Sequence, residues 1–152
     1  MAARYTLPVS ASKYRDGYLW GAHTVSRDLG DGPVAAIRWF QLDVRSWPTI
    51  SVVQEGILAT RGRWSFHPTL AIDVEQNISV IYMQSGLDQF GSAFYAERKS
   101  TDPSGLLRTP ITLRAGSGSR TLADAGLSAF GQYLTGSESW GGWVGRLNLH
   151  SH

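Results

Sequence analysis

The sequence predicts an all-β fold, and three observations carry this prediction. Short apolar or aromatic runs recur along the chain, and each is closed by a turn rich in Gly, Pro, Asp or Ser. Gly accounts for 17 of the 152 residues, which suits a chain with many turns. Helical periodicity is almost absent. The even spacing of the runs favours propeller-like four-stranded antiparallel meanders, two to three blades in number, with a small β-barrel or sandwich as the alternative.

The first blade-like unit is expected over residues 18–56. A turn at 28–33 separates its first two strands, because two glycines and a proline follow an aspartate there. Pro48 ends the next strand, since proline cannot donate to a sheet ladder. Between these breaks the runs are rich in the β-branched and aromatic residues that strands favour. The expected strands span residues 18–25, 34–44 and 49–58.

A second unit of the same kind is expected over residues 64–116. Apolar and polar residues alternate in its first strand, so Leu70, Ile72 and Val74 are predicted to share one face. The segment 101–105 contains Asp, Pro, Ser and Gly and is predicted to be a turn. The expected strands span residues 66–74, 78–84, 92–98 and 108–115.

A partial third unit is expected over residues 129–147, with strands at 130–134 and 140–147. A strand at 5–9 could complete it. We interpret residues 1–152 as one all-β domain. A closed propeller has about four blades or more, so a chain with fewer would leave sheet edges bare. Symmetric assembly into a ring, continuation in a longer chain, or a sandwich or barrel fold would each resolve this, and we expect a homo-oligomer.

Charge and composition argue against several function classes. The chain has 14 basic and 12 acidic residues and no basic stripe, so nucleic-acid binding is not expected. It lacks an apolar run of about 18 residues, so no membrane span is expected. There is no Cys, which removes disulfides and thiolate sites. Neither a metal motif nor a phosphate-binding glycine loop occurs, so we expect no metal and no cofactor. The first residues lack an apolar signal segment.

Seven stretches follow an order that is known from one protein family. They cover residues 19–25, 36–40, 53–56, 67–73, 78–82, 91–98 and 130–136. Together they resemble the distal blades of bacterial sialidase-like (BNR-type) β-propeller proteins. The Asp-box of that family, Ser-x-Asp-x-Gly-x-Thr-Trp, is absent, and Gln132 replaces the acid of the family's last segment. The resemblance implies a propeller fold and a secreted protein.

The resemblance also suggests which residues would contact a ligand. Sialidases use a tyrosine nucleophile with a carboxylate partner, and arginines clamp the acid of the substrate. Aromatic rings can also stack on sugars, so a glycan is the ligand that these residue types suggest. The candidate ligand-binding residues are Arg38, Trp39, Tyr82, Tyr95, Arg98, Gln132 and Tyr133.

Each type of candidate has a structural alternative. For the arginines the alternative is pairing with acids of neighbouring strands on solvated faces, and for each single Trp it is packing in the core. Trp47, which precedes Pro48 in a turn, is the tryptophan expected to be exposed.

We therefore expect a non-catalytic β-propeller-type binding or assembly module that associates with itself through its edge blades. A sialidase-like glycoside hydrolase, or a remnant of one, is the first alternative. A carbohydrate-binding lectin is the second.

Overall fold

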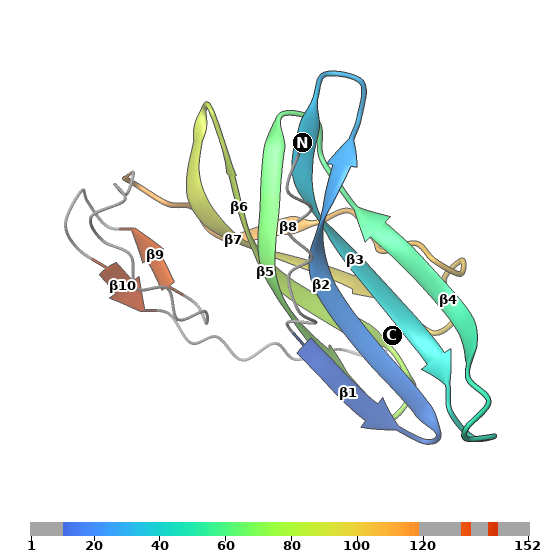
Figure 1. The fold of residues 1–152 in the computed structure, drawn as a ribbon. Coiled ribbons are helices and arrows are strands. Elements are labelled where there is room, and N and C mark those ends of the chain that lie inside the picture. The colour runs from blue at the N-terminus through green and yellow to red at the C-terminus, as the bar shows by residue number, and fades with distance from the viewer. Residues whose placement is uncertain (1–10, 119–131, 135–139, 143–152) are drawn as a thin grey trace.

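The computed structural model describes residues 11–118, 132–134 and 140–142, and this part of the chain is all-β, as predicted (Figure 1). Two four-stranded antiparallel sheets have the strand orders β1-β2-β3-β4 and β5-β6-β7-β8, and we call them sheet 1 and sheet 2. Each is a simple meander, because every strand pairs with the next one along the chain. A further two-stranded sheet joins β9 (Gln132–Leu134) to β10 (Trp140–Gly142).

Sheet 1 contains the three strands that were expected in the first unit and one that was not. β1 was missed because its side chains are mostly exposed, so it shows no apolar alternation. The Gly-rich turn joins β2 to β3 as expected, with positive φ at Gly30 and Gly32. The strands are β1 (Ala11–Arg15), β2 (Tyr18–Asp28), β3 (Pro33–Asp43) and β4 (Ser51–Leu58).

Sheet 2 follows the expected order with two corrections. The first strand ends at Ile72, so Val74 does not share the face of Leu70 but lies in the following turn, where it is exposed. The last strand starts at Ile111 rather than at residue 108. The strands are β5 (Arg63–Ile72), β6 (Ile78–Gly86), β7 (Gln89–Arg98) and β8 (Ile111–Arg114).

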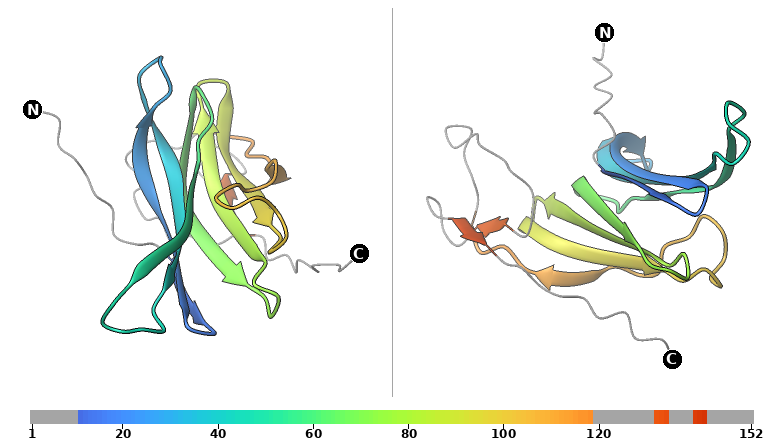
Figure 2. Two further views of the ribbon diagram at one scale, coloured as in Figure 1. Left: turned by 90° about the vertical axis from the view of Figure 1, so that its right-hand side faces the viewer. Right: turned by 90° about the horizontal axis from the view of Figure 1, so that it is seen from below.

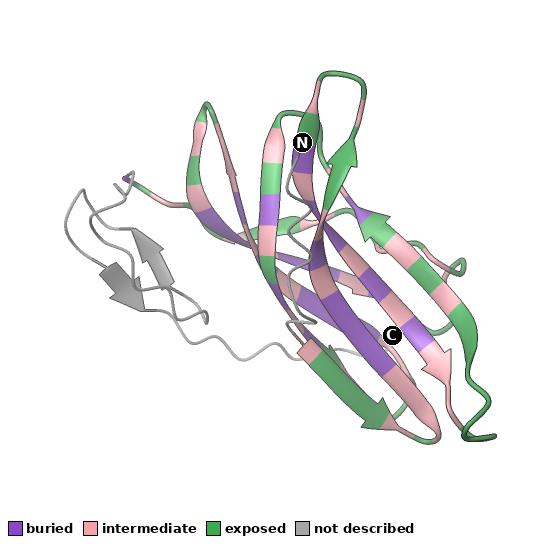
Figure 3. Cartoon of the chain, in the orientation of Figure 1, coloured by how far each residue is buried: buried purple, intermediate pink, exposed green. Residues whose placement is uncertain are grey.

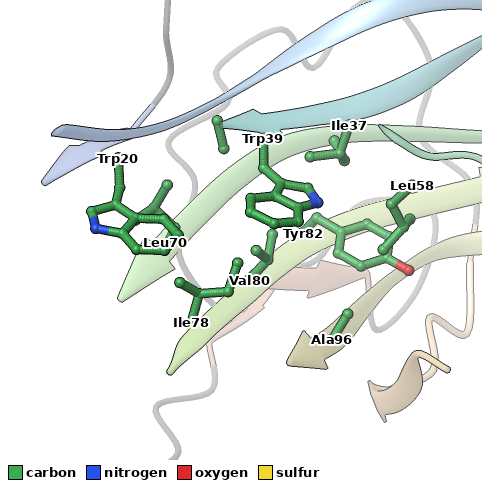
Figure 4. Packing of buried hydrophobic residues seen from close by; sticks show 10 residues of the cluster. Trp20, Ile37, Trp39, Leu58, Leu70, Ile78, Val80, Tyr82 and Ala96 are labelled. Carbon is green, nitrogen blue, oxygen red and sulfur yellow. The ribbon is translucent and has the colours of Figure 1, made fainter. Parts of the chain in front are cut away.

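The two sheets pack face to face, and β5 lies against β1, β2 and β3 (Figure 2). Their facing sides carry the residues of the hydrophobic core, and buried and more exposed residues alternate along much of each strand (Figure 3). Trp20 and Trp39 stack in this core with ring centroids 6.4 Å apart. The core residues of sheet 1 are Trp20, Ala22, Ile37, Trp39 and Leu58, and those of sheet 2 are Leu70, Ile78, Val80, Tyr82 and Ala96 (Figure 4).

The connection between β7 and β8 crosses to sheet 1 and packs on β4. The backbone N–H of Gly105 donates a hydrogen bond of 3.2 Å to the side-chain oxygen of Gln54. A Cβ atom at Gly56 would overlap the carbonyl oxygen of Gly105 and the indole of Trp39. Glycine is therefore required at position 56 by the close approach of this loop.

The remaining expectations fall mostly outside the described residues. The expected strand at 5–9 lies there entirely. Within the expected partial unit at 129–147, the structure describes only β9 and β10. No helix of the described residues is long and apolar enough to cross a membrane.

Candidate functional site

Two of the candidate ligand-binding residues lie in the core. Trp39 and Tyr82 are each 1% exposed. Tyr82 stacks on Phe94 with ring centroids 5.7 Å apart, and burial raises the pKa of its phenol. Neither ring is open to a ligand. Trp39 packs in the core, which was the structural alternative given for each tryptophan.

Arg38 lies on the other side of β3 from Trp39, because successive strand residues point to opposite faces. Its Nε donates a hydrogen bond of 3.1 Å to Oε2 of Glu55, and a second guanidinium nitrogen contacts the same oxygen. Glu55 belongs to the neighbouring strand β4. Arg38 thus pairs with an acid of the neighbouring strand, which was the structural alternative given for the arginines.

Tyr95 belongs to a hydrogen-bonded group on the side of sheet 2 that faces away from sheet 1. Its hydroxyl donates to Oε2 of Glu97 at 2.6 Å and lies 3.3 Å from the hydroxyl oxygen of Ser79. Burial, together with the Glu97 carboxylate, raises the pKa of Tyr95 to about 12. The phenol is therefore protonated at neutral pH and is not an activated nucleophile.

Arg98 is buried and binds the backbone of the following loop. Its guanidinium donates to the carbonyl oxygens of Asp102, at 2.8 Å, and Pro103, at 3.2 Å. It therefore caps the turn that was predicted at 101–105 rather than pairing with an acid across the sheet. The Asp102 carboxylate instead accepts hydrogen bonds from Arg108, which lower its pKa to about 2.

The structure does not bring the described candidates together into one site. Arg38 faces away from sheet 2, whereas Arg98 lies on sheet 2 with its donors turned to the carbonyls of its own loop. Two arginines that clamp one acid would have to converge. Gln132 and Tyr133 lie on β9, and the positions of their side chains are outside the described part of the structure.

A different feature stands out on the outer face of sheet 1, which we define as the face turned away from sheet 2. The register places one residue of each strand in a row across the sheet, and all four are apolar or aromatic. Phe40 lies next to this row with its ring over Gly21. The row consists of Tyr14, Leu19, Leu42 and Val52.

This face continues into the edge strand β4. Val52 is 60% exposed and Ile57 is 46% exposed. Val53 is the extra residue of a β-bulge opposite Gln41 and Leu42, and it is also exposed. Bulges and charges often protect a sheet edge, but here the bulge adds a second apolar side chain.

The β3–β4 connection extends the apolar surface further. Trp47 is 73% exposed, which confirms the prediction for this residue. Ile50 is exposed beside it along the chain. Five of the large exposed hydrophobic residues therefore fall within residues 47–57: Trp47, Ile50, Val52, Val53 and Ile57.

His23 is the titratable group beside Arg38 on the outer face of sheet 1. It lies directly across from Arg38 in the β2–β3 register and packs against the Phe40 ring, with centroids 6.0 Å apart. Burial and then the positive charge of Arg38 lower the pKa of His23. His23 is therefore mostly neutral at pH 7.

Sequence reasoning did not identify the outer face of sheet 1 as a surface. The two consecutive valines, Val52 and Val53, could have indicated it. A regular half-buried strand alternates apolar and polar residues, so two apolar residues in succession leave one on the solvent side. The partner positions on β1 could not be found, since β1 itself was not predicted.

No protein-family model, curated protein or solved structure matches the chain. Among the residues that the structure describes, no group of three or more His, Asp or Glu side chains could hold a metal ion.

Proposed function

We propose that this chain is a non-catalytic β-sheet module that assembles with further copies of itself through the exposed edge of sheet 1. The observation that carries the proposal is the exposed apolar surface at residues 47–57, which lies along an unpaired sheet edge. Monomeric proteins seldom expose contiguous apolar patches of this kind, and bare edge strands are normally covered or charged.

The arrangement of the polar candidates supports a non-catalytic role. Tyr95 is protonated, Arg98 is occupied by loop carbonyls, and Arg38 is paired with Glu55. A hydrolase of sialidase type would need such groups to converge on one substrate. The described geometry gives each of them a structural partner instead.

The first test is the molar mass in solution, measured by light scattering after size exclusion over a range of protein concentrations. We expect a multiple of the 16.6 kDa chain mass that dissociates on dilution. Ile57→Lys should shift this equilibrium toward the single chain, because it places a charge in the apolar surface. Leu87→Lys is the matched control, since Leu87 is 97% exposed in the β6–β7 turn, away from β4. A wild-type mass of 16.6 kDa at every concentration would contradict the proposal.

A second candidate function is carbohydrate binding at the β3–β4 connection, and the exposure of Trp47 favours it. An exposed indole offers a flat apolar face to a sugar ring, and Asp43 and Arg45 lie close by in the chain. The test is Trp fluorescence during titration with glycans, compared with Trp47→Ala. A flat response across a glycan array would remove this candidate.

A further inference from the structure

The strand β2 is much longer than β1, the strand that pairs with it at the edge of sheet 1. β1 begins at Ala11, which lies opposite Ala22, whereas β2 runs on to Asp28. Figure 1 shows β2 continuing past the start of β1. Among the described residues, no strand pairs with this side of β2 over residues 23–28. This part of β2 is therefore a bare sheet edge, of the kind that proteins normally cover.

We propose that residues 5–10 of the same chain continue β1 upstream and pair with residues 23–28 of β2. The segment needs no turn or linker to reach this edge, because it immediately precedes Ala11. The register of β1 and β2, continued residue by residue, places Ser10 opposite His23 and Tyr5 opposite Asp28. The segment is thus as long as the bare edge.

The sequence of the segment fits the two faces of such a strand. Ala11 packs against the core between the sheets, and alternate residues of a strand share a face. Val9 would lie opposite Thr24, which is 8% exposed on the core side of β2. The upstream residues that share the face of Ala11 are all apolar or aromatic: Val9, Leu7 and Tyr5. The added strand would therefore extend the apolar side of β1 over the core.

The hydrogen-bond pattern of the hairpin accommodates Pro8. A two-residue turn, Asp16-Gly17, joins β1 to β2, and both of its residues have positive φ. The pair that closes such a turn, here Arg15 and Tyr18, is a hydrogen-bonded pair. Because hydrogen-bonded and non-hydrogen-bonded pairs alternate, Pro8 would lie opposite Val25 in a non-hydrogen-bonded pair. Its missing N–H would then point away from β2, where an edge strand tolerates proline.

The pairing would also supply a partner for His23. Its Nδ1 atom is buried and has no hydrogen-bond partner among the described residues. Ser10 would lie directly opposite in a non-hydrogen-bonded pair, where side chains approach each other most closely. A serine hydroxyl can donate to a ring nitrogen or accept from its N–H. Since an unpaired buried polar atom costs free energy, this contact favours the paired segment.

Cysteine pairs in the full chain test this register, because the chain contains no Cys of its own. Thr6→Cys with Arg27→Cys places two thiols opposite each other on one face, at a separation that suits a disulfide. Leu7→Cys with Arg27→Cys is the matched control, since its two side chains would point to opposite faces. We expect the first pair to oxidise within one chain and the control pair to stay reduced, as measured by thiol titration and non-reducing electrophoresis.

The other results of this experiment each contradict the proposal. A disulfide between two chains, seen as twice the mass of 16.6 kDa, would mean that the segment pairs with another copy. Equal oxidation of the two pairs would mean that the register is wrong, and no oxidation of the first pair would mean that the segment does not reach β2. None of these results bears on self-assembly through β4, which light scattering of the wild type measures separately.

Hydrogen exchange of the Thr24 backbone N–H tests the pairing without new thiols. In the continued ladder this N–H donates to the carbonyl oxygen of Val9. Val9→Pro removes the reciprocal donor and should speed the exchange about tenfold. Thr6→Pro is the control, because the Thr6 N–H would point away from β2, and it should leave the rate unchanged. A rate that is the same in the wild type and Val9→Pro, or that rises equally in both variants, would overturn the proposal.

Discussion

The side-chain amide of Gln41 donates a hydrogen bond of 3.3 Å to the side-chain oxygen of Gln76, and so joins β3 of sheet 1 to the β5–β6 turn of sheet 2. The same Gln41 accepts a bond of 2.7 Å from Gln54, which in turn accepts the N–H of Gly105. This chain of amides satisfies a buried polar side chain at one end of the sheet-on-sheet interface, because Gln41 is only 4% exposed.

Gln41→Ala is expected to lower the free energy of unfolding by about 1–3 kcal/mol, since it leaves the amides of Gln54 and Gln76 without their buried partner. Chemical denaturation monitored by Trp fluorescence measures this change. Ser104→Ala is the control, because Ser104 makes a longer bond of 3.4 Å to the same Gln54 at an exposed position. Equal effects of the two substitutions would show that the amide chain is unimportant.

Gly56→Ala is expected to destabilise the fold, because the new methyl group would overlap the Gly105 carbonyl and the Trp39 indole. The cost should be roughly 1–3 kcal/mol, as for other substitutions that overpack a close contact. The matched control is Gly91→Ala on β7, where the nearest atom to an added Cβ is the Met83 methyl at 3.9 Å. Thermal unfolding of both variants tests the difference, and a tolerated Gly56→Ala would mean that the β7–β8 loop does not pack on β4.

Two tyrosines on neighbouring strands should respond in opposite ways to loss of their hydroxyl groups. The Tyr82 hydroxyl is buried and has no hydrogen-bond partner among the described residues, so Tyr82→Phe should leave stability unchanged or increase it. The Tyr95 hydroxyl donates to Glu97, so Tyr95→Phe should cost about 1–3 kcal/mol. Urea denaturation of the two variants is the measurement. A larger loss for Tyr82→Phe than for Tyr95→Phe would contradict the described packing.

His23 should make the fold less stable in mild acid. Its pKa in the folded chain lies below the ordinary value of 6.5, so the unfolded chain binds the proton more readily. Its contribution to stability is therefore intact above pH 6.5 and is lost as the pH falls through the lowered pKa. Stability measured between pH 7 and pH 5 should fall less steeply in His23→Gln than in the wild type.

The same titration can be followed directly by NMR of the His23 ring. Arg38→Gln should raise the pKa of His23, because the Arg38 charge contributes to lowering it. A wild-type His23 that titrates at or above its ordinary value would show that the ring is neither buried nor close to Arg38.

The fold could be predicted from the sequence wherever a strand has one buried face. The alternation in β5 and the apolar runs of β2 and β6 supply the side chains of the core between the sheets, so these strands can be recognised in the sequence. Val74 was predicted to share a face with Leu70 only because the alternation continues past the end of the strand at Ile72. β1 has no such pattern, since pairing with β2 holds it at the edge through its backbone.

The candidate site was less predictable, because it depends on which residues meet across strands and loops. The Arg38–Glu55 pair agrees with the expectation that an arginine on a strand pairs with an acid of its neighbour. Arg98 does not, since its partners are backbone carbonyls of a loop that turns back over the end of β7. Backbone oxygens have no signature in a sequence, so a contact of this kind cannot be read from residue types.

The meander order of the two sheets has a consequence for the newly made chain. Sheet 1 is continuous in sequence and can form as soon as residue 58 has left the ribosome. The strands of sheet 2 that cover it extend to residue 98. At usual rates of synthesis they follow about 2 to 8 s later. Until then the sides of Trp20 and Trp39 that pack on sheet 2 lack this cover, and transiently exposed apolar surface of this kind makes a nascent chain prone to aggregation.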